Sequence, residues 1–307
     1  MRADPLPATV DDTVADPLDA ALACDHPVLA IITGITGPSY RPLGEMMVFC
    51  GDRQIGSLSS GCVETDLARH AQEALSKGTI KLRYGEGSPW FDLRLPCGGG
   101  LEITLIPRPC PDLLADVASA RAARQHVALS MTPDLRLHRC EPGPTGPTEQ
   151  GFRVALTPPP RFLIFGQGPE AAIFANLVRA AGYPHLVLAP DHQTLTQAEA
   201  QGCKARPLHW PALPADLHID DRSAVVLFFH DHDWEPPILA RALDSPAFYI
   251  GAQGSRRARD TRLARLRELG VTKGLDRLHG PIGLIGSARD PRILAVSVLA
   301  EVLDRAS

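Results

Sequence analysis

The spacing of apolar residues divides the chain into a part with short strands and a part where strands and helices alternate. In the first part, β-branched and apolar runs predict strands at 28–33, 46–50, 55–58, 79–84 and 101–106. Apolar residues recur at helical spacing from Val63 to Leu75, and Lys77-Gly78 supplies a stop signal. These patterns predict a small α+β domain over residues 16–107, preceded by a flexible polar tail at 1–15.

The second part reads as a connector followed by a Rossmann-like domain. Residues 108–160 are expected to form a helix, a hairpin that pairs 127–131 with 152–156, and a stiff proline-rich linker at its end. From residue 161 onwards the pattern predicts alternating elements, with strands at 161–165, 185–189, 224–229, 247–250 and 282–286 and helices at 169–182, 256–270 and 291–303. The fold class is therefore α/β, with a mostly parallel sheet in a domain over 161–307.

Composition and charge exclude several kinds of partner. The 307 residues carry a formal net charge of −4 and no basic stripe, so no nucleic-acid partner is expected. No apolar run approaches the roughly 20 residues that span a bilayer, and the acidic N-terminus lacks a signal pattern, which favours the cytoplasm and no membrane partner. The seven cysteines are scattered, without a C-x-x-C pair, so neither a disulfide framework nor a structural zinc site is expected.

The glycine-rich stretch Gly56–Glu64 joins a strand to the amphipathic helix and places Cys62 beside the start of that helix. Unpaired backbone N–H groups and the helix dipole favour an anion there and lower the pKa of a thiol. Small residues before Cys62 leave room for a bulky ligand. The alternative is a small buried cysteine at a tight turn. Arg41, in the turn-rich loop 34–44, is either a solvated charge or an anion clamp.

In the second domain, Gly166 and Gly168 belong to a G-x-G-x-x-A turn between a strand and a helix. The first glycine permits the turn and the second lets a phosphate approach the backbone. Ala189 stands where a ribose-binding acid is expected, and Asp191 comes two residues late. We therefore expect no NAD(P) cofactor. The alternative to a dinucleotide-binding domain is a Rossmann domain with a purely structural role.

Two further segments of this domain carry candidate chemistry. His230 and Asp231 follow a buried strand, where they could ligate a metal, act as acid and base, or cap the next element. Ser255 and Arg256 begin a basic helix and are anion-site candidates, whereas the rest of its arginine run is expected to be a solvated face.

Five segments in order resemble the XdhC/CoxI family, the accessory proteins of xanthine dehydrogenases and related molybdenum hydroxylases. Gly56-Ser57-Leu58-Ser59-Ser60-Gly61-Cys62-Val63-Glu64 is similar to the family's G-S-x-S-G-G-C-x-E signature. The other similar segments are Arg41-Pro42-Leu43-Gly44, Cys97-Gly98-Gly99, Tyr249–Arg256, and the closing pair Pro281–Leu284 and Ala295–Glu301.

The resemblance implies a protein that binds the molybdenum cofactor as cargo, assists its sulfuration and inserts it into a hydroxylase, which favours a cofactor carrier over an enzyme. It implies an apo-hydroxylase and a cysteine desulfurase as partners, and a homodimer is compatible with it. Cys62 would ligate the metal or carry sulfur. The residues expected to hold the cofactor are Arg41, Gly44, Ser59, Ser60, Gly61, Cys62, Glu64, Cys97, Gly98, Gly99, Gly166, Gly168, His230, Asp231, Gly251, Gly254, Ser255 and Arg256.

Two other functions remain open from the sequence. One is an NAD(P)-dependent oxidoreductase that uses Gly166–Ala171 and His230–Asp233. The other is an interaction scaffold without a ligand, in which the glycine-rich turns are structural. Because Rossmann sheets bind ligands at their carboxyl edge and pockets often lie between domains, we expect residues of both domains to contribute to binding.

Overall fold

The computed structural model describes residues 16–59, 61, 63–88, 98–231, 233–286 and 288–306. It forms two compact units, Met1–Pro158 and Pro159–Ser307. The division falls within the proline-rich segment 157–160. Each unit has its own hydrophobic core, so each is described by itself.

The first unit is built on a five-stranded antiparallel sheet with the order β3-β2-β1-β5-β4. Its strands are β1 (Val28–Thr36), β2 (Met46–Cys50), β3 (Arg53–Gly56), β4 (Ile80–Gly85) and β5 (Gly100–Pro107). Side chains alternate between the two faces of a strand, so that Leu29 and Ile31 enter one core while Ala30 and Ile32 enter another. Both faces of this sheet are therefore covered.

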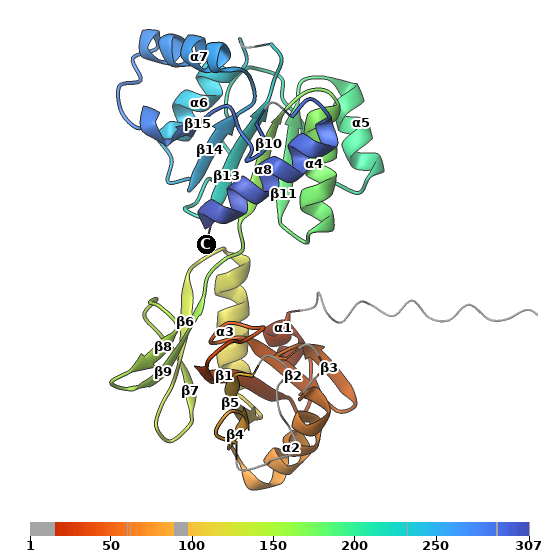
Figure 1. The fold of residues 1–307 in the computed structure, drawn as a ribbon, viewed down its shortest axis with the longest axis vertical. Helices are drawn as coiled ribbons and strands as arrows, with labels where there is room; N and C mark the ends of the chain where they lie inside the picture. Colours follow the sequence, from red (N-terminus) through yellow and green to blue (C-terminus); the bar gives the residue numbers. More distant parts are fainter. Residues whose placement is uncertain are drawn as a thin grey trace, which may run out of the picture. The chain divides into compact units, whose positions relative to one another are not determined.

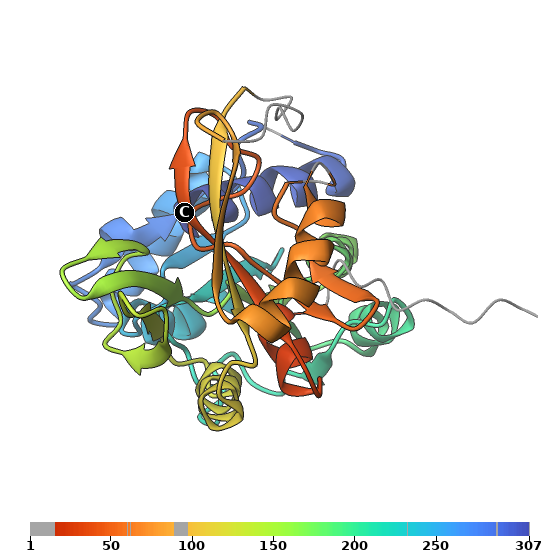
Figure 2. The same cartoon turned by 90° about the horizontal axis from the view of Figure 1, so that it is seen from below.

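Helix α2 (Glu64–Lys77) covers one face through Leu67, Ala71 and Ala74. The opposite face packs against α1 (Pro17–Leu22), α3 (Pro111–Ala122) and a second, four-stranded sheet with the order β7-β6-β9-β8. Figure 2 shows α2 and this small sheet on opposite sides of the larger sheet. The strands of the small sheet are β6 (Val127–Met131), β7 (Leu137–Cys140), β8 (Gly146–Thr148) and β9 (Gly151–Leu156).

Two features of the first unit differ from expectation. β6 and β9 pair as predicted. The segment between them in the sequence also forms two short strands, β7 and β8. β7 pairs only with β6 and β8 pairs only with β9, so these two strands form the outer edges of the small sheet. Cys24 and Cys50 form a disulfide with a Cα–Cα distance of 6.0 Å. The expectation of no disulfides from the scattered cysteines is therefore wrong for this pair. Cys24 and Cys50 are 26 positions apart, and only the fold brings them within bonding distance.

The second unit contains a six-stranded parallel sheet with the order β12-β11-β10-β13-β14-β15 (Figure 1). Its strands are β10 (Arg161–Gly166), β11 (His185–Ala189), β12 (Ala205–Pro207), β13 (Ser223–Phe228), β14 (Tyr249–Ala252) and β15 (Leu278–His279). Its helices are α4 (Pro169–Ala180), α5 (His192–Ala200), α6 (Glu235–Leu243), α7 (Arg256–Glu268), the short η1 (Leu275–Arg277) and α8 (Pro291–Ala306).

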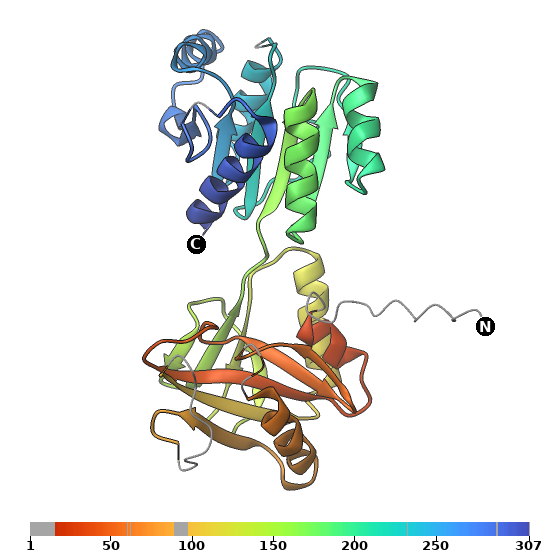
Figure 3. The same cartoon turned by 45° about the vertical axis from the view of Figure 1, so that its right-hand side comes forward.

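Helices cover both faces of this sheet. α4 and α8 lie on the same face, as Figure 3 shows, and their side chains share one core with Phe162 and Val226. α6 and α7 pack on the other face through Ile238, Leu239 and Leu266. This arrangement confirms the α/β class with a C-terminal Rossmann-like domain.

The last strand differs from the prediction. Residues 282–286 form a loop, and β15 at Leu278–His279 takes the edge position instead. Gly283 has a φ of +102°, which breaks an extended run, and Leu284 and Ile285 are 63% and 52% exposed. Of this apolar run, Ile282 is buried in a core, whereas Leu284 and Ile285 lie at the surface. Within the described residues, no helix is both long and apolar enough to cross a membrane.

Candidate functional site

Three loops of the first unit leave the same edge of the five-stranded sheet. The end of β1 pairs with the start of β5 (Thr36 with Gly100), the start of β2 pairs with the end of β3 (Met47 with Gly56), and β4 ends at Gly85 beside Gly100. The loops 37–45 and 86–99 therefore begin and end at this edge, and the loop 57–63 leads from it to α2. It is the edge that gathers the segments holding Arg41, Ser59, Gly61, Gly98 and Gly99.

Glu64, the first residue of α2, organises the loop 57–63. Its carboxylate is 9% exposed and turns back over the loop that precedes the helix. Six hydrogen bonds from described residues converge on its two oxygens, at distances of up to 3.1 Å. The donors are the N–H groups of Leu58, Ser59, Gly61 and Val63 and the hydroxyls of Ser57 and Ser59.

The charge of Glu64 is stabilised by these contacts. Burial alone would raise the pKa of this carboxyl, but the hydroxyl and N–H of Ser59 and further hydrogen bonds lower it to about 2. The carboxylate therefore binds the N–H groups of the loop, and its negative charge lies at the helix start, where the sequence pattern favours an anion or a Cys62 thiolate. We interpret Glu64 and the buried Ser59 as residues that position the loop.

The neighbours of Cys62 show how the loop presents its tip. Gly61 is exposed and has a φ of +101°, a conformation that favours glycine, and a Cβ built there would meet no atom within 4 Å. Val63, on the other side, is buried and donates its N–H to the Ser59 hydroxyl at 3.0 Å. Ser60, Cys62 and Cys97 lie outside the described residues.

The loop with Arg41 packs beside the turn at Gly98-Gly99. The hydroxyl of Ser39 accepts from the Arg41 N–H at 3.3 Å and donates to the Arg41 carbonyl at 2.7 Å, while the Arg41 side chain is exposed. A Cβ built on Gly99 would lie 2.0 Å from the Pro38 carbonyl oxygen, so only glycine fits this approach. Gly98 is exposed and open at its Cβ position.

Gly44 has a structural role in the same loop. A Cβ on this residue would lie 2.6 Å from the Thr145 methyl carbon. The glycine therefore lets the loop pack against the small sheet, and its N–H donates to the Ile32 carbonyl at 2.9 Å. Burial raises the pKa of nearby Glu45, and the charge of Arg41 partly offsets this. Arg41 is thus the loop's exposed cation, whereas Gly44 is explained by the packing of the loop against the small sheet.

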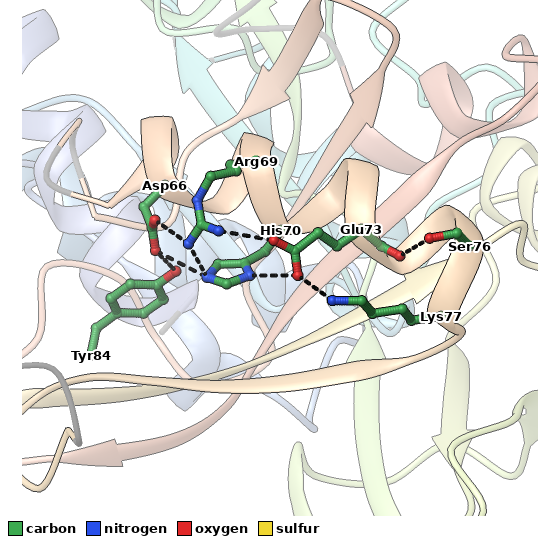
Figure 4. Close-up of polar contacts among 7 residues, drawn as sticks. All are labelled: Asp66, Arg69, His70, Glu73, Ser76, Lys77 and Tyr84. Atoms are coloured by element: carbon green, nitrogen blue, oxygen red, sulfur yellow. Dashed lines mark hydrogen bonds and ion pairs between the residues drawn. The ribbon is translucent and has the colours of Figure 1, made fainter.

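A polar network on α2 lies one turn beyond Glu64 (Figure 4). The buried Tyr84 of β4 donates its hydroxyl to Asp66 at 2.7 Å, which fastens the helix to the sheet. Burial opposes the charge of Asp66, but Tyr84 and Arg69 hold its pKa below the ordinary value. His70 lies between Asp66 and Glu73, at 3.4 and 3.7 Å. The network holds the helix start that carries the loop.

We expect Tyr84→Phe to lower the free energy of unfolding by about 1–2 kcal/mol, because Asp66 then loses a buried donor. Urea unfolding measures this change. Tyr40→Phe is the matched control, since Tyr40 is 60% exposed and its variant should unfold like the parent. Equal stability of the Tyr84 variant and the parent would show that this bond does not hold α2.

In the second unit, the glycine-rich turn is filled by the protein's own side chains. Thr194 of α5 accepts the Gly168 N–H through its hydroxyl at 2.8 Å. The Glu170 carboxylate folds back, so that its Oε2 lies 3.4 Å from a Cβ built on Gly168. Gly166 needs to be glycine because its Cβ would meet the Phe228 carbonyl oxygen at 2.6 Å. A negative charge and an occupied N–H group oppose a pyrophosphate at this position.

Asp191 does not replace the missing ribose-binding acid. It is the N-cap of α5, and its Oδ1 accepts the Thr194 N–H at 2.8 Å. The Asp191–Thr194 pair therefore fixes α5 against the glycine-rich turn.

The His230 edge forms a carboxylate–imidazole pair. His230 Nε2 lies 3.5 Å from Glu170 Oε2, and the imidazole is 59% exposed. Asp231 accepts the Asp233 N–H at 3.0 Å, and Asp233 pairs with Arg265. Among the residues that the structure describes, no group of three or more His, Cys, Asp or Glu side chains is arranged to hold a metal ion.

The segment 251–256 serves mainly to build the fold. A Cβ on Gly251 would lie 2.6 Å from the Tyr249 hydroxyl oxygen, so a glycine at position 251 leaves room for the Tyr249 side chain. Ser255 caps α7 by accepting the Ala258 N–H at 3.2 Å, and Arg256 is exposed. Gly254 differs from these residues, because it lines a cavity at the end of β14.

Sequence reasoning missed two buried ionic groups. Glu301 of α8 accepts from the Tyr249 hydroxyl at 3.0 Å and from the Gly283 N–H, so it ties the loop 280–286 to the helix. Arg262 of α7 is 2% exposed and binds Glu235 through two hydrogen bonds of 2.8 and 3.0 Å. The prediction that this arginine run is a solvated face is wrong for Arg262. Its partner Glu235 comes from α6, 27 positions earlier.

Comparisons with known proteins cover nearly the whole chain. Residues 23–85 match the family model described as "XdhC and CoxI family", and residues 162–302 match "XdhC Rossmann domain". A relative from Escherichia coli (strain K12), "Molybdenum cofactor insertion chaperone PaoD", is 36% identical over 93% of this chain and 85% of its own length. A probable xanthine dehydrogenase subunit from Bacillus subtilis (strain 168) is 26% identical over 93% of this chain and 95% of its own length.

The fold is also known from a solved structure. The crystal structure of a protein described as a xanthine dehydrogenase from Bacillus halodurans matches with a TM-score of 0.75 and covers 95% of both chains. Its sequence identity of 23% supports a likeness of fold alone.

Proposed function

Because the chain belongs to the XdhC and CoxI family, we propose that it binds the molybdenum cofactor as cargo and inserts it into a molybdenum hydroxylase. The name of the 36% identical relative, a molybdenum cofactor insertion chaperone, supports this proposal. The Rossmann unit corresponds to the family's own domain, since 162–302 match the XdhC Rossmann domain. The xanthine dehydrogenase name of the second relative supports a hydroxylase apo-enzyme as the client.

One structural observation carries the proposal: the loop 57–63 is held in shape by Glu64 at an edge that it shares with Arg41. The cofactor offers a phosphate and a soft, sulfur-ligated metal. A guanidinium suits the phosphate and a thiolate suits molybdenum or sulfur. Arg41 would bind the anionic end, Cys62 would ligate the metal or carry sulfur, and Cys97 would assist.

The test is to purify the chain from a molybdate-fed host that makes the cofactor and to measure bound molybdenum and pterin. We expect both to co-purify with the protein in equal amounts. A preparation without either would contradict the proposal. Co-purification with a cysteine desulfurase and a mass measurement in solution would test the predicted sulfur donor and homodimer.

An NAD(P)-dependent oxidoreductase is not supported by the glycine-rich turn. We expect calorimetry to detect no saturable binding of NAD or NADP at millimolar nucleotide, because Ala189 lacks a carboxylate for the ribose and Glu170 opposes the pyrophosphate. A missing hydrogen bond of this kind weakens binding by about 1–3 kcal/mol.

The substitution Glu170→Gln tests whether the Glu170 carboxylate is what prevents nucleotide binding. Removing the negative charge should raise nucleotide affinity if Glu170 is what repels the phosphates, whereas Glu199→Gln on the exposed surface of α5 should leave it unchanged. Tight binding of either dinucleotide by the parent protein would contradict the expectation and restore the oxidoreductase hypothesis.

A further inference from the structure

A cavity of about 250 Å³ lies at the carboxyl edge of the parallel sheet, between the end of β14 and the loop that leads to α8. This is the edge at which open α/β sheets bind ligands. The volume is below the roughly 300 Å³ at which pockets for drug-sized ligands begin, so it suits one ring system. Its lining includes Gln253, Gly254, Ile282, Gly283, Gly286 and Leu294.

The wall of this cavity is held in place. Glu301 binds the Gly283 N–H, and the Ser297 hydroxyl accepts the Ile285 N–H at 2.7 Å. A Cβ on Gly283 would lie 2.6 Å from the Ser297 oxygen, so the loop sits tightly on α8. Gly286, in contrast, has open space at its Cβ position. The loop that forms this wall is thus fixed to α8.

Gln253 is the polar residue of the lining. Its N–H donates to the Leu227 carbonyl at 2.9 Å, and its own carbonyl accepts from the buried Arg262 at 2.7 Å, so its backbone is fixed. Its side-chain Oε1 is buried and has no hydrogen-bond partner among the described residues. A buried acceptor without a donor lowers stability, and rotation about the soft terminal torsion can present the carboxamide to a ligand.

The other lining residues exclude a charged ligand. Those described are apolar or glycine, with Pro281, Ile285 and Ala288 completing the set. The exposed side chains of Leu284 and Ile285 extend this apolar surface. A carboxamide places an acceptor beside a donor, and this pair complements the edge of a planar nitrogen heterocycle. Apolar walls suit the faces of such a ring.

We propose that this cavity binds a planar nitrogen heterocycle through Gln253, a ring that presents an N–H donor beside a ring acceptor. The proposal deepens the proposed function and rests on it, because the cargo contains a pterin ring of this chemistry. A nucleobase has the same edge, so the test separates the two sources.

The experiment uses the full chain, purified without cofactor, and measures its affinity for free pterin and for adenosine, guanosine, cytidine and uridine by equilibrium dialysis. We expect saturable binding of free pterin if the cavity holds a pterin ring, or of one of the nucleosides if it holds a nucleobase. Gln253→Leu should weaken it about tenfold or more, the equivalent of one hydrogen bond. Gly286→Val, which adds a bulky side chain to the lining, should weaken it as much.

Gln201→Leu is the matched control. Gln201 also has a buried Oε1 without a partner in the described chain, but it lies at the C-cap of α5, outside the cavity lining. Its variant should bind like the parent, and thermal unfolding should show all variants folded.

Failure of this inference differs from failure of the proposed function. If no ring binds, or if Gln253→Leu and Gly286→Val bind as the parent does, the cavity is not a ring site, even when the parent purifies with molybdenum. If the parent purifies without molybdenum and pterin from a proficient host, the proposed function fails, and the dialysis still decides whether the cavity takes a ring.

Discussion

Replacing Cys62 by serine is expected to abolish retention of molybdenum by the purified chain while leaving its fold intact. Serine keeps the size of the side chain but replaces a soft thiolate by a hard hydroxyl, which is a poor ligand for molybdenum or sulfur. The loop should keep its shape, since its hydrogen bonds run from Ser59, Gly61 and Val63 to Glu64. Metal analysis after purification from a cofactor-proficient host measures the loss.

Cys110→Ser is the control for this substitution, because Cys110 is a free, exposed cysteine at the start of α3. It should retain molybdenum like the parent. We expect Cys97→Ala to cause a partial loss. If Cys62→Ser holds as much molybdenum as the parent and unfolds at the same urea concentration, the cysteine is structural and the proposed role of the loop is wrong.

Glu64→Gln is expected to destabilise the first unit by about 3 kcal/mol at neutral pH and to reduce cofactor retention with it. The carboxyl titrates near 4.5 when unfolded and at about 2 when folded, and about 1.36 kcal/mol accompanies each pKa unit. The amide of glutamine cannot accept the hydrogen bonds on both sides. Urea unfolding of the parent and the variant measures the difference.

The lowered pKa of Glu64 also predicts how the stability of the first unit depends on pH. Because the folded pKa of Glu64 is depressed, its stabilisation is fully present above about pH 4.5 and is lost as the pH falls towards 2. The stability gap between the parent and Glu64→Gln should therefore close over this range. Glu73→Gln, on the exposed side of α2, should change stability much less than Glu64→Gln, because its ion pairs are solvated. A gap that does not narrow on acidification would contradict the role assigned to the carboxylate.

Local patterns predict most elements of the fold. The period of Leu67, Ala71 and Ala74 places α2 within one residue of its observed start, because these side chains face one core. The strand predicted at 282–286 is wrong, since hydropathy alone does not distinguish a buried run from a surface loop held by Ser297 and Glu301.

Contacts between residues far apart in the sequence are harder to predict. Thr194 reaches Gly168 across 26 positions, and Arg262 reaches Glu235 across 27, so neither contact has a sequence signal. Glu64 belongs to the loop signature, but it lies five positions after Ser59, whereas the residues of a capping box lie three apart. The sequence spacing therefore does not predict their hydrogen bonds. That its carboxylate faces inwards, towards the loop, depends on backbone geometry that spacing does not encode.

The loop 57–63 has a further property that follows from where its donors lie. Every described group that binds Glu64 comes from within seven positions of it, so ordering this segment requires closure of only a very short loop. Such contacts form quickly, without waiting for distant strands to pair. If the loop opens to release a bound molecule, it can regain its shape at once, using nothing beyond its own sequence and the first turn of α2. A carrier that must empty and refill repeatedly benefits from a site that resets locally.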